Sequence, residues 1–118
     1  MNEAKKTTLF GKWAKAHKKK TFVFEAKISK KPSLSFNAVK IHQKMSLFQA
    51  KFGSFFFKIP DSGYQQMPFD GFFLYQVDAF VVIFWYLSKG DRRMTIISID
   101  KWIKEEKKSI RKSITYNR

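Results

Sequence analysis

The sequence predicts an α/β fold in which helices flank a central mixed β-sheet, and its 118 residues predict a single domain over residues 1–118. Three observations lead to this prediction. Two segments repeat apolar residues at helical spacing, the segment Thr21–Ile28 alternates its residues between two faces, and Phe80–Tyr86 is a continuous apolar run. A run of this kind is typical of a central strand that is covered on both faces.

The chain is expected to begin with a helix followed by a strand. Thr7 or Thr8 can cap a short helix that ends at Ala16 and leads into a basic stretch. The next segment, Thr21–Ile28, is rich in aromatic and branched residues and is expected to be a strand. One face of this strand carries Phe22, Phe24 and Ala26, and the other carries Val23, Glu25 and Lys27.

A loop and a second helix are expected next. The lysine, proline and serine residues of Ser29–Phe36 indicate a surface loop. Asn37 can cap a helix through Lys51, in which the apolar residues Ala38, Ile41, Met45, Phe48 and Phe52 recur at helical spacing. A second strand over Gly53–Ile59 should then end at the turn Pro60–Gly63.

The second half of the chain is expected to be mainly β. Two strands, Phe69–Tyr75 and Ala79–Tyr86, are expected to form a hairpin about Gln76–Asp78, and a last strand covers Met94–Ile99. Asp100 can cap a final helix from Lys101, in which Trp102 and Ile103 pack while the other residues are charged. The basic tail Lys107–Arg118 is expected to fray.

The charge of the chain points to a polyanionic partner. Lysine and arginine outnumber the acidic residues 24 to 9, which gives a formal net charge of +15. Nucleic acid fits best, because basic residues gain free energy when they release counterions from a phosphate backbone. Two alternatives stay open, namely an anionic membrane surface and a basic surface that is simply solvated.

Composition narrows the class further. The absence of cysteine excludes disulfides and cysteine-ligated zinc, which leaves an oxygen-ligated divalent metal open. Met1–Lys20 lacks the apolar core of a secretory signal, and the longest apolar run, Ala79–Leu87, is much shorter than the roughly 20 residues of a membrane helix. We therefore expect a soluble protein that acts in the cytoplasm, of cellular or phage origin.

Glu25 and Lys27 are the residues that point to chemistry. They lie two places apart on a strand that is otherwise apolar, so a carboxylate and an ammonium project into the same space. A carboxylate in that position can hold a cation, and a lysine beside it can face a phosphate or an attacking water. An ordinary strand with a solvated polar face is the alternative interpretation of this short motif.

The wider pattern resembles a known nuclease family. Phe24-Glu25-Ala26-Lys27, the loop that ends in Leu34-Ser35-Phe36 and the pair His42-Gln43 resemble the PD-(D/E)XK nuclease superfamily, and within it the RecU-type and phage Holliday junction resolvases. The segments Lys58–Asp61, Pro68–Phe72 and Ala79–Ile83 are similar to resolvase-like proteins of this group. The resemblance covers about residues 20 to 115 and implies a restriction-endonuclease-like core.

The resemblance implies roles for individual residues. Glu25 would be a metal ligand, Lys27 would orient the attacking water or stabilise charge on phosphorus, and Gln43 would position groups near the site. The metal would be Mg²⁺, with Mn²⁺ as a substitute, held by Glu25, a second acid and a backbone carbonyl near Ala26. The reaction would be hydrolysis of a DNA phosphodiester bond by an endonuclease.

The second acid is an open question in the sequence. The superfamily normally supplies an aspartate on the strand before the Glu-x-Lys strand, but no aspartate precedes Glu25. Asp70, in Pro-Phe-Asp-Gly-Phe, is our choice, because a neighbouring strand can bring it beside Glu25. Asp61 is the alternative, although its segment is first of all a turn, and Glu3 is a third candidate.

The expected partner is DNA. Lysines in the loop after the first strand and near both termini would contact phosphates and make binding depend on salt. The residues expected to bind nucleic acid are Lys18, Lys19, Lys20, Lys30, Lys31 and His42. The resemblance further implies a homodimer that acts on a four-way junction, without contact to a membrane. A DNA-binding protein on a degenerate nuclease fold, without catalysis, is the competing hypothesis.

Overall fold

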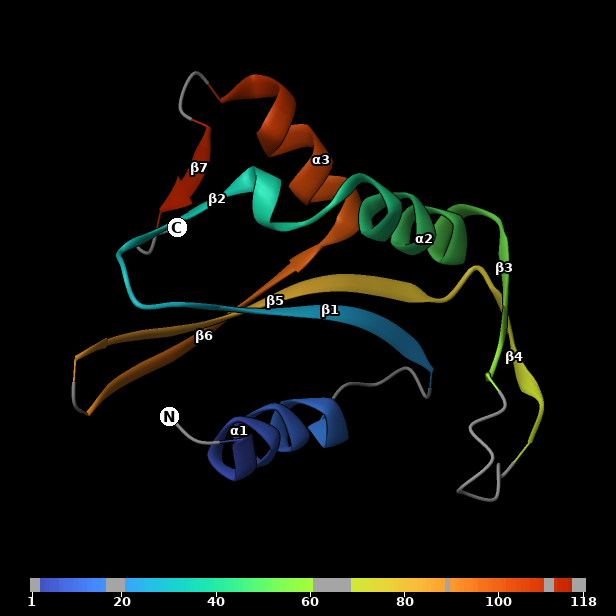
Figure 1. Cartoon of the computed structure of the whole chain (residues 1–118), viewed down its shortest axis with the longest axis horizontal. Helices are drawn as coiled ribbons and strands as arrows, with labels where there is room; N and C mark the ends of the chain where they lie inside the picture. Colours follow the sequence, from blue (N-terminus) through green and yellow to red (C-terminus); the bar gives the residue numbers. More distant parts are fainter. Residues whose placement is uncertain (1–2, 17–20, 61–68, 89, 110–111, 116–118) are drawn as a thin grey trace.

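The computed structural model contains three helices and seven strands within the residues that it describes, which are 3–16, 21–60, 69–88, 90–109 and 112–115 (Figure 1). In chain order, the elements are α1 (Glu3–Ala16), β1 (Phe22–Ser29), β2 (Ser33–Ser35), a 3₁₀ turn η1 (Phe36–Ala38), α2 (Ile41–Phe52), β3 (Ser54–Lys58), β4 (Gly71–Tyr75), β5 (Asp78–Ser88), β6 (Asp91–Ser98), α3 (Ile99–Lys108) and β7 (Ser113–Thr115).

The centre of the molecule is a three-stranded mixed sheet in the order β1-β5-β6. β1 runs parallel to β5, and β6 runs antiparallel to it. Residues 81–85 of β5 are all buried, so the expectation of a central strand covered on both faces is confirmed. The helices and the mixed sheet together confirm the predicted α/β class.

Helices cover both faces of this sheet. Figure 1 shows α2 and α3 above the sheet and α1 below it. The core on the upper side joins alternate β5 residues, Val81, Ile83 and Trp85, to Trp102 of α3 and Leu47 of α2. Each fully buried side chain of this size contributes about 1.5–3 kcal/mol, so this cluster fixes α2 and α3 over the sheet.

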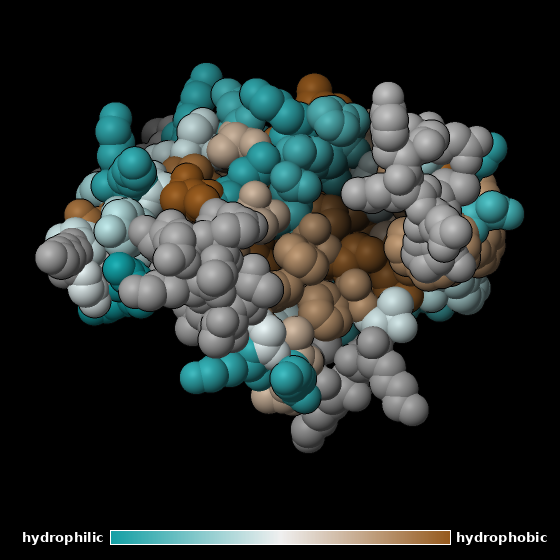
Figure 2. Space-filling view, turned by 60° about the horizontal axis from the view of Figure 1, so that its bottom comes forward, coloured by the Kyte–Doolittle hydropathy of each residue, from teal (hydrophilic) through white to brown (hydrophobic). Residues whose placement is uncertain are grey.

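The lower side of the sheet is held by aromatic contacts. Phe10 and Trp13 of α1 meet Phe24 and Phe80, with ring centroids 4.3 Å apart for Phe10 and Phe24 and 5.3 Å apart for Trp13 and Phe80. Figure 2 brings this side forward and shows hydrophobic residues at the surface across its middle. Phe24 of β1, which contacts Phe10 of α1, is 45% exposed.

The apolar stripe of α2 faces away from the core. The helix begins at Ile41, three residues later than Ala38, because η1 occupies Phe36–Ala38. Its buried residues are Leu47 and Ala50, whereas the apolar residues at helical spacing, Ile41, Met45, Phe48 and Phe52, are exposed. The periodicity therefore predicted the helix, but it did not indicate the face that packs on the sheet.

The expected hairpin between Phe69–Tyr75 and Ala79–Tyr86 is wrong. β4 pairs with β3 in a separate two-stranded sheet, and β5 enters the central sheet. The change of partner occurs at Gln76, whose φ is +51°, and at Val77. The Gln76 N–H donates to the Gly53 carbonyl and the Val77 N–H donates to the Ala50 carbonyl, which bind this connection to the end of α2.

Two further expectations need correction. The segment Ser29–Phe36, expected as a loop, contains β2, and the tail expected to fray contains β7. These two short strands pair antiparallel, with Leu34 opposite Ile114. Ile114 is buried in the core cluster, and this burial explains why the basic tail is ordered there. Among the described helices, none is both long and apolar enough to span a membrane.

Candidate functional site

Glu25 and Lys27 lie side by side on the face of β1 that α2 covers. Lys27 Nζ is 3.2 Å from Glu25 Oε1, and the two side chains are 22% and 29% exposed, respectively. The expectation that they share one face is confirmed. Because about three quarters of each side chain is covered, the pair does not lie on a freely solvated strand face.

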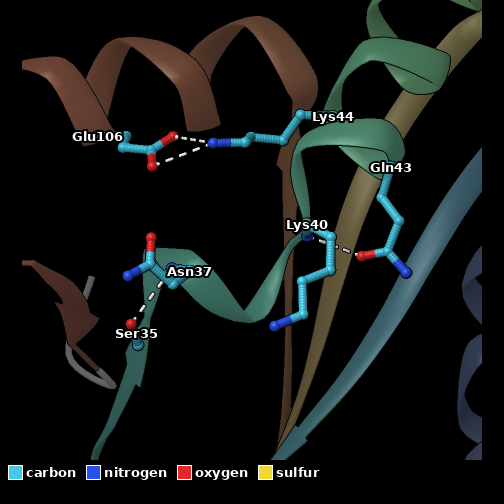
Figure 3. Close-up of polar contacts among 6 residues, drawn as sticks. All are labelled: Ser35, Asn37, Lys40, Gln43, Lys44 and Glu106. Atoms are coloured by element: carbon cyan, nitrogen blue, oxygen red, sulfur yellow. Dashed lines mark hydrogen bonds and ion pairs between the residues drawn. The ribbon is translucent and has the colours of Figure 1, made fainter.

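Gln43, in the first turn of α2, completes this cluster from above. Its Nε2 donates to Glu25 Oε1 at 3.0 Å, and its Oε1 accepts from the Lys40 N–H at 2.9 Å. Figure 3 shows the Gln43 side chain extending from α2 towards β1. The bond to Lys40 also satisfies a backbone donor at the start of the helix, so the amide is held in one orientation.

The two contacts to Glu25 fall on the same oxygen. Lys27 and Gln43 both approach Oε1, and no contact to Oε2 is found within the described parts of the chain. Ionised carboxylates accept hydrogen bonds or bind cations through either oxygen. The carboxylate is therefore oriented through one oxygen, which leaves the other as the candidate cation ligand.

Ion pairs hold α2 in its place above β1. Lys44 Nζ lies 2.9 Å and 3.1 Å from the two carboxylate oxygens of Glu106 on α3 (Figure 3). Lys51 Nζ is 2.5 Å from Asp100 Oδ1. The hydrogen bond from Lys51 lowers the pKa of Asp100 below its ordinary value, although desolvation opposes this shift. These pairs join the two helices whose position determines where Gln43 lies.

Asp70 does not join this cluster. It directly precedes β4, where its carbonyl accepts from the Ile59 N–H and its side chain is exposed. Asp70 lies away from Glu25, contrary to the expectation, because β4 pairs with β3 rather than with β1. Within the described residues, no group of three or more histidine, aspartate or glutamate side chains could hold a metal.

Asp61 and Glu3 are the other two candidates for the second acid. Asp61 lies outside the described residues, and the side chain of Glu3 is not described. Ala26, whose carbonyl was expected near the metal, lies between Glu25 and Lys27, and its backbone pairs with Val82 of β5. Glu25 is thus the one acid of the described chain that meets both Lys27 and Gln43.

The basic residues expected to bind DNA are exposed where the structure describes them. Lys30 and Lys31 follow β1 in a turn that Ser29 organises, since its hydroxyl lies 2.9 Å from the Lys31 carbonyl oxygen and 2.8 Å from that of Ser33. His42 is exposed in the first turn of α2. Lys18, Lys19 and Lys20 lie outside the described residues.

Two features of the molecule were not anticipated from the sequence. One is the bond between the Lys40 N–H and Gln43, for which a glutamine three residues after a helix cap was the available signal. The other is the aromatic face of the β3–β4 pair, which depends on a strand pairing that the sequence did not predict.

Comparisons with protein-family models, with curated proteins and with solved structures found no match.

Proposed function

We propose that this chain is a Mg²⁺-dependent DNA endonuclease that hydrolyses phosphodiester bonds at the Glu25–Lys27–Gln43 cluster. The observation that supports the proposal most directly is the arrangement of Glu25, whose Oε1 is held by two donors while Oε2 carries no contact in the described chain. A net charge of +15 supports nucleic acid as the substrate. The order of the motif residues supports a restriction-endonuclease-like core of the resolvase type.

Glu25 is the one carboxylate that the described cluster offers to a magnesium ion. Mg²⁺ keeps several waters and often takes only one or two protein carboxylates, with substrate phosphate as a further ligand. Glu25 would provide the carboxylate. When bound, such an ion supplies charge neutralisation at the phosphate and a more acidic water.

The residues of the chain then have distinct tasks. Lys27 and Gln43 hold the Glu25 carboxylate in one orientation, so that no reorganisation is needed when substrate arrives. The Lys27 ammonium has two further N–H groups besides the one that faces Glu25, and these can donate to a phosphate oxygen. Lys30, Lys31 and His42 contact neighbouring phosphates, and a homodimer would place two such clusters on a branched substrate.

A cleavage assay with matched variants tests the proposal. The substrates are a labelled four-way junction and a linear duplex of the same sequence, each with Mg²⁺ or with EDTA. We expect cleavage only with Mg²⁺, and Glu25→Gln should reduce it by about 100-fold or more because the cation ligand is weakened. Asp70→Asn is the control, since it removes an exposed carboxylate that lies outside the cluster.

A non-catalytic DNA-binding protein is the second candidate, and the position of Asp70 outside the cluster favours it. In that case the wild-type chain binds the junction but cleaves nothing with either Mg²⁺ or Mn²⁺. Cleavage that persists unchanged in Glu25→Gln would also reject the endonuclease proposal, because the activity would then come from elsewhere.

A further inference from the structure

One face of the β3–β4 hairpin consists largely of exposed aromatic side chains. In its register, Phe56 lies opposite Phe73 and Ser54 lies opposite Tyr75. Phe56, Phe73 and Tyr75 therefore share a face, and they are 62%, 70% and 63% exposed. A cluster of apolar side chains this open is typical of an interaction site, because monomeric proteins rarely expose large apolar patches.

The three rings form a small platform. Phe73 and Tyr75 are two residues apart on β4, which corresponds to about 7 Å along a strand. Phe56 projects from β3 directly opposite Phe73, with about 5 Å expected between their Cβ atoms. Aromatic residues displayed in this way on a sheet are a recurrent means of stacking unpaired bases.

The opposite face of the hairpin is more covered. It carries Phe55 and Leu74, which are partly buried, and Phe57 and Phe72, which are 48% and 45% exposed. The Phe72 ring also meets that of Phe69 at 5.0 Å between centroids. Figure 1 places the hairpin at one end of the molecule, beside the start of β5. The platform of Phe56, Phe73 and Tyr75 is thus the more open face of the hairpin.

Charge indicates which partner fits the platform. Lys58 ends the same face of the hairpin and is exposed. A second copy of this chain would bring another net charge of +15 to the interface, whereas a polynucleotide brings phosphates. Stacking on aromatic side chains is also open to every base, since each base has a π-face.

We propose that this face of the β3–β4 hairpin binds single-stranded DNA, with bases stacked on Phe56, Phe73 and Tyr75 and a backbone phosphate at Lys58. The inference extends the proposed function, because it names unpaired nucleotides as the part of the substrate that the chain grips. Binding at this face requires neither Glu25 nor a metal, so it can be tested apart from cleavage.

Fluorescence anisotropy in EDTA tests the platform with two labelled oligomers of equal length and charge. One is an oligothymidylate and the other is an abasic strand. We expect the wild-type chain to bind the oligothymidylate about tenfold or more tightly, since stacking needs bases. Phe73→Ala and Tyr75→Ala should each weaken this binding about fivefold or more and leave the abasic strand unaffected.

Matched variants separate stacking from other effects. Phe57→Ala changes a half-exposed ring on the opposite face of β3 and should alter neither affinity by more than about twofold. Phe73→Tyr keeps a ring and should retain binding, which tests the proposal even if the alanine variant unfolds. Lys58→Ala should weaken binding to both strands and reduce the slope of log affinity against log salt concentration by about 0.7.

Several results would overturn the platform. Equal affinity of the wild-type chain for the two DNA strands, or unchanged binding by Phe73→Ala, would leave only nonspecific charge attraction. If Phe73→Ala changes the sedimentation of the chain alone but not its binding to the oligothymidylate, the face binds a second copy of the chain. If the variant changes only binding to phosphatidylglycerol vesicles, the face binds a membrane. Loss of cleavage in Glu25→Gln is independent of all these outcomes, so failure of one proposal leaves the other standing.

Discussion

Glu25, Lys27 and Gln43 should behave as a coupled unit in the free energy of unfolding. Lys27 Nζ and Gln43 Nε2 lie 3.2 Å and 3.0 Å from the same carboxylate oxygen. We expect Glu25→Gln and Lys27→Met each to destabilise the fold. The double variant should lose less than the sum of the two changes, because each single variant already removes the attraction between the charges.

The size of the coupling follows from distance and burial. At an effective dielectric of 20, two charges 3.2 Å apart attract by about 5 kcal/mol, most of which the desolvation of both ions offsets. Exposed pairs couple by about 0.2–1 kcal/mol, and removing one partner of a fully buried pair costs about 3–5 kcal/mol. Side chains that are 22% and 29% exposed lie between these cases, so we expect a coupling of about 1.5 kcal/mol.

Urea denaturation followed by circular dichroism measures this coupling in a double-mutant cycle. The pair Lys44 and Glu106 provides a calibration cycle, because its distance is 2.9 Å and its side chains are 19% and 26% exposed. If the calibration cycle gives a coupling above about 1 kcal/mol while the Glu25–Lys27 cycle gives less than about 0.3 kcal/mol, the pair on β1 is solvated. Lys27 would then not hold the Glu25 carboxylate in one orientation, contrary to the proposal.

Two further predictions concern the hairpin and the ion pair at α3. Gly71→Ala should destabilise the protein by about 1–3 kcal/mol in thermal denaturation, because the added Cβ would overlap the Phe57 carbonyl oxygen. Gly53→Ala is the control and should be tolerated, because a Cβ added there meets nothing closer than 3.4 Å. Asp100 has a lowered pKa in the folded state, so its contribution is present above the unfolded pKa and is lost as pH falls through the folded value. Since the Asp100 side chain is 50% exposed, Lys51→Met should lower the free energy of unfolding by less than about 1 kcal/mol near neutral pH. The effect should become progressively smaller as the pH falls, and urea denaturation from neutral to acid pH measures it.

Local pattern was sufficient for the elements that carry the candidate cluster. The alternation in Thr21–Ile28 placed Glu25 and Lys27 on one face, and the apolar run placed β5 at the centre, since both signals depend only on neighbouring residues. Gln43 was named from the family resemblance. Its two hydrogen bonds depend on where α2 crosses β1, which no local pattern specifies.

The wrong predictions share a physical cause, because the partners of strands and helices are decided by contacts between residues far apart in the chain. A short connection between two strand-like segments favours a hairpin, but here Gln76 and Val77 bind the carbonyls of Gly53 and Ala50 instead. This redirects β4 to β3 and carries Asp70 away from β1. The outward apolar stripe of α2 has the same origin, because periodicity defines a stripe without defining what covers it.

The position of β1 limits how the proposed cation site can be completed. Among the described strands, β1 pairs only with β5, so no described strand pairs with its other edge. Further oxygen ligands for a cation at Glu25 can therefore come from a substrate phosphate or from another strand that adds to this edge. Linkage separates these cases, because a ligand stabilises the fold in proportion to its occupancy. If phosphate completes the site, Mg²⁺ should raise the melting temperature appreciably only when DNA is present. If a second chain completes it, the effect should appear without DNA and grow with protein concentration.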